Sequence, residues 1–217
     1  MSHKVHPKIF RIRGASDWLS RGFYEKNLSS YLREDFIIRK FLEDSLKSKG
    51  VEKIVIERFP GKMNVVIFSA RPGLIIGRRG GGVDLLKQQL LKILLKNHID
   101  INDKEKKINL EVREIRNPWV SAALIGQWIA QRLEKRIPYR RALKQTLDKV
   151  MANKEVQGAR IEISGRLNGV EIARRAWLAK GRLPRQTIRA NIDYVLSTAH
   201  CSYGVIGIKV WVYKGDI

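Results

Sequence analysis

Four residues in the first half of the chain combine the features that a phosphate-binding loop needs. Gly77 and Gly80 enclose Arg78 and Arg79, and a helical pattern of apolar residues begins at Val83. Glycine lacks a Cβ, so its backbone can approach a polyanion closely. The free amides at the start of the following helix carry partial positive charge. With two fixed cations between the glycines, the loop predicts contact with a nucleic-acid backbone.

The Gly-x-x-Gly spacing is not specific by itself. Residues 204–207 repeat it with Val205 and Ile206 between the glycines, and a strand-like run follows, which favours a plain turn. The first copy differs in its context, because a helix, two β runs and a short turn precede it and a helix and a strand follow it. That order is typical of a type-2 K-homology (KH) domain, whose GXXG loop holds a nucleic-acid backbone.

Apolar periodicity and turn signals place both halves of the chain in the α+β class. In the first half they predict a helix from residue 35 to a stop at Gly50, strands over 51–58 and 63–70, a turn at 72–76, a helix over 83–96, a polar loop at 98–106 and a strand over 108–115. In the second half they predict helices from 117 to about 136 and from 138 to about 154, then strands over 159–164, 170–178, 188–196 and 206–213.

These elements divide the chain into three expected parts. Residues 1–16 form a basic arm without an acidic residue, which is either a disordered end or a segment that orders on RNA. Residues 17–116 form the KH domain, with a three-stranded sheet and helices on one face. Residues 117–217 form a sandwich of two helices on a four-stranded sheet.

Composition indicates a polyanionic partner. The chain holds 43 Lys and Arg against 21 Asp and Glu, a net charge of +22. Such a balance is typical of nucleic-acid binders, and an anionic membrane is less favoured because the charge is spread over folded segments. Cys201 is the single cysteine, which suits a reducing compartment. Without a signal peptide or an apolar run of about 20 residues, we expect a cytoplasmic or organelle-matrix protein.

A second cationic feature lies on the helix that is predicted from residue 138. At 100° per residue, its apolar residues fall within an arc of about 80° and its basic residues within a neighbouring arc of about 100°. The apolar set is Tyr139, Leu143, Leu147 and Val150, and the basic set is Arg140, Arg141 and Lys144. No acid stands four residues before Lys144, so its helix does not neutralise it from that position. A solvated helix face is the alternative, but contact with a polyanion is favoured.

The remaining basic residues gather in the arm and in the C-terminal strands. The predicted RNA contacts there are Lys4, Lys8, Arg11, Arg13, Arg166, Arg174, Arg175, Lys180, Arg182, Arg185 and Arg189. Arginine dominates the C-terminal group and suits bidentate phosphate contacts. Trp177 and Trp211 lie among them, and we expect both to pack in the core rather than to stack on bases.

Catalytic residues are not recognisable in this sequence. The four histidines show no metal-ligand spacing with Cys201 or with carboxylates, and there is no P-loop. Glu162 and Glu171 lie among so many arginines that ion pairing is the simpler interpretation. We therefore predict no enzyme activity, no metal, no cofactor and no small-molecule substrate.

Taken together, the motifs resemble those of the bacterial-type ribosomal protein S3 (uS3) family over essentially the whole chain. The matching segments are 4–7 (KVHP), 54–58 (IVIER), 70–73 (ARPG), 77–80 (GRRG), 139–144 (YRRALK), 164–174 (SGRLNGVEIAR), 192–194 (IDY) and 203–215 (YGVIGIKVWVYKG). The segments 164–174 and 203–215 are the most specific.

The resemblance implies a structural protein in the head of the small ribosomal subunit, bound to 16S-type rRNA. It implies the small-subunit proteins S10, S14, S4 and S5 as neighbours, and a place where messenger RNA enters the ribosome. In the family, the residues that match Arg140, Arg141 and Lys144 face incoming mRNA and help to unwind it without ATP. The loop with Arg78 and Arg79 would lie on the solvent side nearby.

Some residues depart from the family pattern. The arm lacks a glycine that the family often has after Pro7, which leaves its path on RNA open. Gly81 and Gly82 replace a more usual acidic residue, which predicts a looser helix start, and Asn191 stands where aspartate is common. Two rival functions remain from the residues alone: a free KH-domain regulator or assembly factor, and a metal-dependent nuclease.

Overall fold

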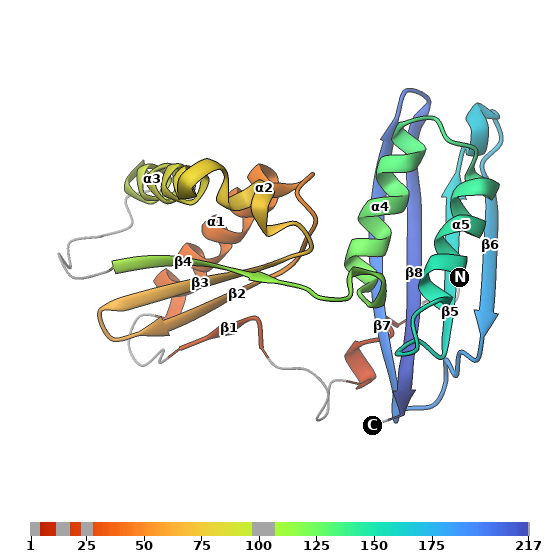
Figure 1. Cartoon of the computed structure of the whole chain (residues 1–217), viewed down its shortest axis with the longest axis horizontal. Coiled ribbons are helices and arrows are strands. Elements are labelled where there is room, and N and C mark those ends of the chain that lie inside the picture. Colours follow the sequence, from red (N-terminus) through yellow and green to blue (C-terminus); the bar gives the residue numbers. More distant parts are fainter. Residues whose placement is uncertain (1–4, 12–17, 23–27, 97–106, 217) are drawn as a thin grey trace. The chain divides into compact units, whose positions relative to one another are not determined.

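The structure is a computed structural model that describes residues 5–11, 18–22, 28–96 and 107–216. Two compact units are present, one of residues 17–116 and one that joins residues 1–16 to residues 117–217 (Figure 1). Lys4, Arg13 and the predicted polar loop at 98–106 lie outside the described residues. Among the helices that are described, none has the length and apolar character needed to cross a membrane.

The unit of residues 17–116 contains the predicted KH order of elements. These are α1 (Leu28–Leu46), β2 (Val51–Phe59), β3 (Lys62–Ser69), α2 (Pro72–Ile76), the 3₁₀ turn η2 (Arg78–Gly80), α3 (Gly81–Lys96) and β4 (Lys107–Glu114). The sheet has the order β1-β2-β3-β4, because β1 (Ser20–Arg21) pairs in parallel with β2. We predicted three strands; a two-residue strand is too short to show a period of two.

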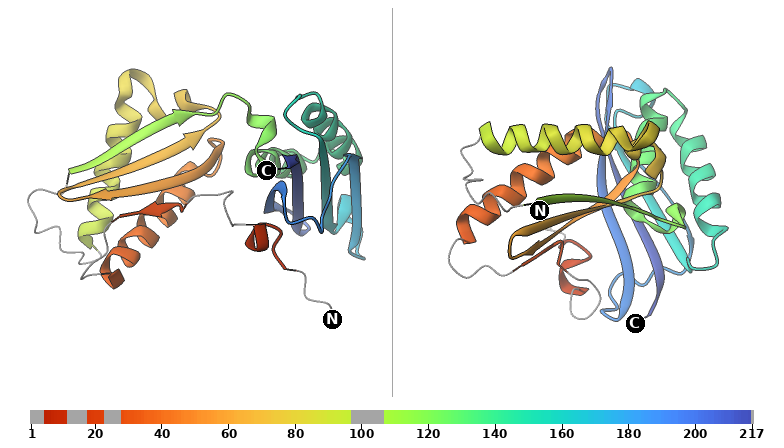
Figure 2. Two further views of the ribbon diagram at one scale, coloured as in Figure 1. Left: turned by 90° about the horizontal axis from the view of Figure 1, so that it is seen from below. Right: turned by 60° about the vertical axis from the view of Figure 1, so that its left-hand side comes forward.

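Helices α1 and α3 cover one face of this sheet (Figure 2). Leu42 of α1 and Leu90 of α3 are almost fully buried against Ile56, Val65 and Ile67 of the strands. The stripes that place these residues are those that the periodicity predicted. The loop 77–80 lies between α2 and α3, which contribute Ile75 and Leu86 to the same core.

Helix α1 begins seven residues before the predicted start, and ion pairs explain the extension. Glu34 and Asp35 are buried in its second turn and accept hydrogen bonds from Arg58 of β2 at 2.7 and 2.6 Å. Burial alone would lower the pKa of Arg58, but its bonds to the two carboxylates raise that pKa above its usual value. Arg58, which lies 24 residues from Glu34 in the sequence, therefore stabilises the first turns of α1, which have no apolar stripe of their own.

The second unit is a two-layer sandwich. Its elements are η3 (Pro118–Val120), α4 (Ala122–Glu134), α5 (Tyr139–Met151), β5 (Gly158–Gly165), η4 (Leu167–Gly169), β6 (Arg174–Gly181), β7 (Ala190–Cys201) and β8 (Gly204–Asp216). The strands are antiparallel in the order β6-β5-β8-β7, and α4 and α5 cover one face (Figure 1). Ile129, Leu143, Ile161 and Val210 are nearly or fully buried between the layers.

Several boundaries in this unit differ from the prediction. The last two strands are longer than predicted, because β7 continues to Cys201 and β8 begins at Gly204, so residues 204–207 lie in a strand and not in a plain turn. The first helix starts with the 3₁₀ turn η3 and becomes α-helical only at Ala122. The strand predicted from residue 170 begins at Arg174, because η4 turns the chain through Asn168, whose φ is +57°. Residues 170–173 are exposed, so no neighbouring strand requires them to be extended.

Candidate nucleic-acid interface

The loop 77–80 has the backbone that its glycines predict. Gly77 and Gly80 adopt φ of +69° and +82°, in the left-handed region that favours glycine. Arg79 is also left-handed, with φ +54° and ψ +26°, a conformation that costs a side chain with a Cβ about 1–2 kcal/mol. Within the part of the chain that the structure describes, the exposed guanidinium groups of Arg78 and Arg79 have no hydrogen-bond or ion-pair partner.

Gly82 closes the loop against α2. A Cβ at this position would lie 2.4 Å from the carbonyl oxygen of Ile75 and 2.9 Å from that of Ile76. At Gly81 a Cβ would meet nothing within 4 Å. The prediction of a loose start of α3 is therefore incomplete. Gly82 also lets the backbone of α3 approach the carbonyl groups of α2 more closely than a larger residue would allow.

The basic set on α5 is exposed, as predicted, while the apolar set packs beneath it. Leu143, Leu147 and Val150 are 2%, 6% and 0% exposed, and Tyr139 packs at the edge of the same core. The one acid within reach of Lys144 along the helix is Asp148, which pairs with Lys180 of β6 at 3.2 Å instead.

No ion pair is recorded for Arg140, Arg141 or Lys144 among the described residues. The Nε of Arg140 donates to the hydroxyl of the neighbouring Tyr139 at 3.2 Å. We call these three cations the α5 patch. They present unneutralised positive charge from a single rigid helix.

A cluster of aromatic and cationic side chains holds the rotation of α5. The guanidinium of Arg132 in α4 lies 3.8 Å from the ring centre of Trp128 and donates to the side chain of Gln145 on α5. The ammonium of Lys149 lies 5.0 and 5.1 Å from the ring centres of Trp119 and Trp128. These contacts anchor the face of α5 beside the α5 patch, and nothing in the local sequence pattern had indicated them.

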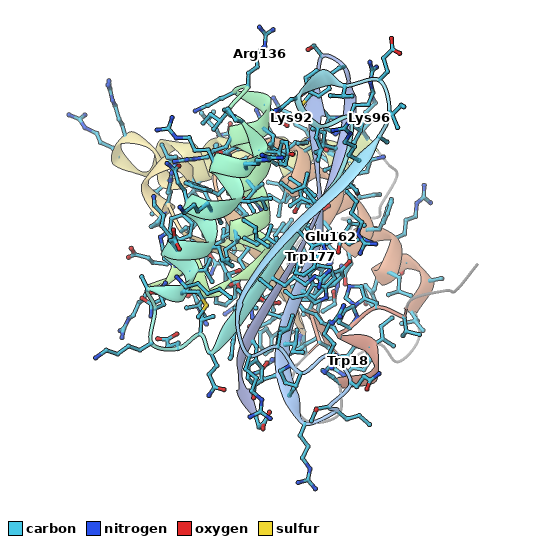
Figure 3. The ribbon with its side chains drawn as sticks, turned by 90° about the vertical axis from the view of Figure 1, so that its right-hand side faces the viewer. Trp18, Lys92, Lys96, Arg136, Glu162 and Trp177 are labelled. Carbon is cyan, nitrogen blue, oxygen red and sulfur yellow. The ribbon has the colours of Figure 1, made fainter. Side chains whose placement is uncertain are left out.

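Arg136 is a candidate that the sequence analysis missed. It ends α4 with φ +60°, and its N–H donates to the carbonyl of Leu133 while that of Ile137 donates to the carbonyl of Arg132. This is a Schellman cap, whose left-handed position is usually glycine. The exposed side chain points away from the ribbon (Figure 3), four residues before Arg140. Its place between two predicted helices was the signal that could have found it.

The C-terminal arginines and lysines divide into two groups. Arg166 donates to the carbonyls of Val170 and Tyr203 at 3.2 and 3.3 Å, Arg175 pairs with Glu162 at 2.6 Å, and Lys180 pairs with Asp148. The other group is exposed and has no side-chain partner among the residues that the structure describes: Arg174, Arg182, Arg185 and Arg189.

Glu162 and Trp177 sit opposite each other on β5 and β6, on the sheet face away from the helices (Figure 3). Burial raises the pKa of Glu162, but hydrogen bonds from Arg175 and Arg160 outweigh it and bring the pKa below its usual value. The predicted ion pairing of Glu162 is confirmed. The prediction that Trp177 is a core residue is wrong: it is 53% exposed, 4.2 Å above the guanidinium of Arg160.

The arm packs against its own unit. Lys8 pairs with Asp193 at 2.5 Å, and the ring of His6 meets that of Tyr194 edge-on at 4.8 Å. Arg11 is 6% exposed, and burial lowers its pKa. Of the predicted RNA contacts that the structure describes, Arg11 is therefore the one whose side chain is least able to reach a ligand. Among the described residues, no cluster of His, Cys, Asp and Glu has the size of a metal site.

Comparisons with known proteins agree with the geometry. Residues 37–120 match the KH domain family, which defines the class of the first unit, and residues 129–212 match "Ribosomal protein S3, C-terminal domain". "Small ribosomal subunit protein uS3" of Caldicellulosiruptor saccharolyticus is 42% identical over 100% of this chain and 94% of its own length.

Further relatives show the same full-length similarity. The proteins named uS3 in Syntrophomonas wolfei and uS3c in Guillardia theta are each 43% identical over 100% of this chain, and over 91% and 96% of their own lengths. The chain therefore belongs to the uS3 family. This is a family of structural, non-enzymatic proteins, which confirms the prediction that the chain is not an enzyme.

Proposed function

We propose that this protein is a structural component of the small ribosomal subunit that binds rRNA in the head and guides mRNA where it enters. Its relatives carry the name of that subunit. The observation that carries the mRNA role is the α5 patch. Three cations on one well-packed helix have no ion-pair partner among the described residues, and Asp148, the acid four residues after Lys144 on α5, pairs with Lys180.

Phosphate groups are the ligands that such a patch attracts. The attraction does not depend on base sequence, and each neutralised phosphate releases counterions, so affinity falls steeply with salt. A rigid helix that grips one strand of an arriving duplex favours the separated strands over the paired ones. Movement of mRNA through the ribosome supplies the work, so this passive unwinding needs no nucleotide site.

The other exposed cations suit the rRNA. We assign rRNA contact to the free C-terminal arginines Arg174, Arg182, Arg185 and Arg189, with Arg166, Arg175, Lys180, Lys8, Lys4 and Arg13 as further candidates. The loop 77–80 is the candidate for a second backbone contact near incoming RNA. S10, S14, S4 and S5 are the proposed neighbours, in a cytoplasmic or organellar ribosome.

The mRNA role is tested by changing Arg140, Arg141 and Lys144 together to Ala. Reconstituted ribosomes with this variant should translate hairpin-containing mRNA more slowly than wild type, with unstructured mRNA nearly unaffected. The control removes three exposed lysines from the other unit, Lys40, Lys47 and Lys92, and should leave the ratio of the two rates unchanged. Equal slowing on both mRNAs would contradict unwinding.

A second experiment tests the ribosomal role independently of the mRNA role. The protein should sediment with small subunits through moderate salt, because many phosphate contacts act together. Recovery only in the free pool would favour a KH-domain regulator instead.

A further inference from the structure

The N-terminal arm returns to a loop more than 170 residues away. The guanidinium of Arg11 donates to the carbonyl of Arg185 at 2.7 Å, to that of Thr187 at 3.1 and 3.2 Å, and to that of Pro184 at 3.5 Å. It also donates to the carbonyl of Pro7 at 2.8 Å, so one side chain ties the turn η1 (Ile9–Arg11) to the loop.

The loop concerned, residues 182–189, links β6 to β7 and contains no helix or strand. Its start is fixed by the N–H of Arg182, which donates to the carbonyl of Gln157 at 3.3 Å, and by Leu183, which packs against the cluster of Ala190, Ile192 and Tyr213. After Leu183, the hydrogen bonds from Arg11 are the polar contacts that hold the backbone of the loop among the described residues.

The chemistry of Arg11 suits this task. A guanidinium offers five donors in a fixed planar fork, so it can gather several carbonyl oxygens at once. Bonds from a charged donor are stronger than neutral ones, and a buried donor cannot exchange them for water. The arm has two further anchors, from Lys8 to Asp193 and from His6 to Tyr194, which place Arg11 over the loop.

The loop carries three of the four C-terminal arginines that have no side-chain partner among the described residues, Arg182, Arg185 and Arg189, all exposed. We propose that Arg11 is a positioning residue: it does not bind RNA itself but holds this loop in the shape in which its three arginines meet phosphates. The proposal rests on the proposed RNA-binding function of the loop.

The test compares four full-length variants: Arg11→Ala, Arg11→Lys, the loop triple Arg182→Ala with Arg185→Ala and Arg189→Ala, and Arg11→Ala within that triple. Lys154→Ala is the matched charge control, since it removes an exposed cation of the same unit that lies outside both the arm and the loop. Circular dichroism checks folding, and Arg11→Lys, which keeps the charge but loses the fork, serves if Arg11→Ala does not fold.

Limited trypsin digestion measures how accessible the loop backbone is. The rate of cleavage after Arg185 is followed by mass spectrometry. Loss of several charge-assisted bonds should raise that rate about tenfold or more in Arg11→Ala. Arg11→Lys should be intermediate, and Lys154→Ala should stay close to wild type. Unchanged cleavage in Arg11→Ala would overturn the clamp.

Binding to a labelled 20-nucleotide single-stranded RNA reads the function, as the slope of log K against log salt. The loop triple should make the slope shallower by about 2, at roughly 0.7 per lost phosphate contact. Arg11→Ala should make it shallower by less, and should add nothing within the triple. A further loss of about 0.7 within the triple would mean that Arg11 binds phosphate itself, and would overturn the proposal.

The two readouts separate the ways to fail. A triple that binds RNA like wild type would contradict the proposed function of the loop, and with it any positioning for RNA, whatever trypsin shows. A triple that weakens binding beside an Arg11→Ala variant that opens the loop and binds normally would overturn the positioning role alone.

Discussion

The loop 77–80 and the α5 patch both present exposed arginines, but they hold them in different ways. In the loop, two glycines and a left-handed Arg79 set the backbone locally. The position of α5 is fixed by packing against other elements, through its stripe of buried residues and through the Trp119–Trp128 cluster. The loop cations therefore depend on a few dihedral angles, and the patch cations on the packing of a whole unit.

This difference explains why only one of the two could be read fully from its own residues. The conformation of the loop 77–80 could be predicted from its glycines and arginines together with the elements next to it in the sequence. A basic helix face looks the same whether it is solvated or rigidly presented, and the distinction comes from neighbours distant in the sequence. The predictions that follow test the two kinds of support separately.

The largest effect is expected from truncating a buried side chain in the core below the α5 patch. Leu143→Ala leaves a cavity between α5 and the sheet and should lower the free energy of unfolding by about 2–5 kcal/mol. Urea titration followed by tryptophan fluorescence measures it, since four of the five tryptophans lie at residues 119–211. The control Leu85→Ala, at a position 60% exposed on α3, should change stability by no more than about 0.5 kcal/mol. Similar losses in both would contradict the packing role of Leu143.

A smaller effect is expected at the start of α3, where the loop meets α2. Gly82→Ala forces a Cβ against the carbonyl of Ile75 and should destabilise the KH unit by about 1–3 kcal/mol. Gly81→Ala is the matched control, because its φ of −59° is helical and its Cβ meets nothing. That change should stabilise the helix by about 0.5–1 kcal/mol. Circular dichroism melts of the full chain measure both, and the prediction fails if the two variants shift the same way.

Acid should act on the unit that carries the α5 patch through Glu162. Its pKa is below the usual value in the folded state, so the stability it contributes is present above an unfolded pKa of about 4.3 and is lost as pH falls through the folded pKa. Tryptophan-monitored urea midpoints should therefore fall with pH in this acidic range. Glu162→Gln should flatten that dependence, and an equally steep curve in the variant would show that another carboxylate is responsible.

The smallest effects are expected at Arg79 and Arg136, the two arginines whose backbone is in the left-handed region. Arg79→Gly and Arg136→Gly should each stabilise the protein by about 0.5–1 kcal/mol, because glycine relieves the strain but costs chain entropy. Each should also make the salt dependence of RNA binding shallower by about 0.7. Arg78→Gly, where φ is not positive, should lose the contact without gaining stability. A variant that gains stability and keeps the full slope would remove that arginine from the interface.

Most elements could be predicted because their own side chains carry the pattern. Leu42, Leu86 and Leu90 follow the helical period, and the β runs around residues 60 and 160 are strongly apolar. Two misses share a cause: the start of α1 needs Arg58, and β1 depends on pairing with β2, so each is decided by a contact that is distant in the sequence. The irregular 170–173 segment has a local cause, because it follows the turn through Asn168.

The family and RNA binding could be predicted from the sequence alone, and the two arginine-rich sites could be proposed from it, because residue types, charge and motif spacing are local properties. Only the tertiary structure decided which cations are free. It paired Asp148 with Lys180 and left the α5 patch charged, exposed Trp177 above Arg160, and turned Arg11 inward onto loop carbonyls. The physical reason is that a side chain's partner is set by which strands and arms meet, and these meet across more than 30 residues for Lys180 and more than 170 for Arg11.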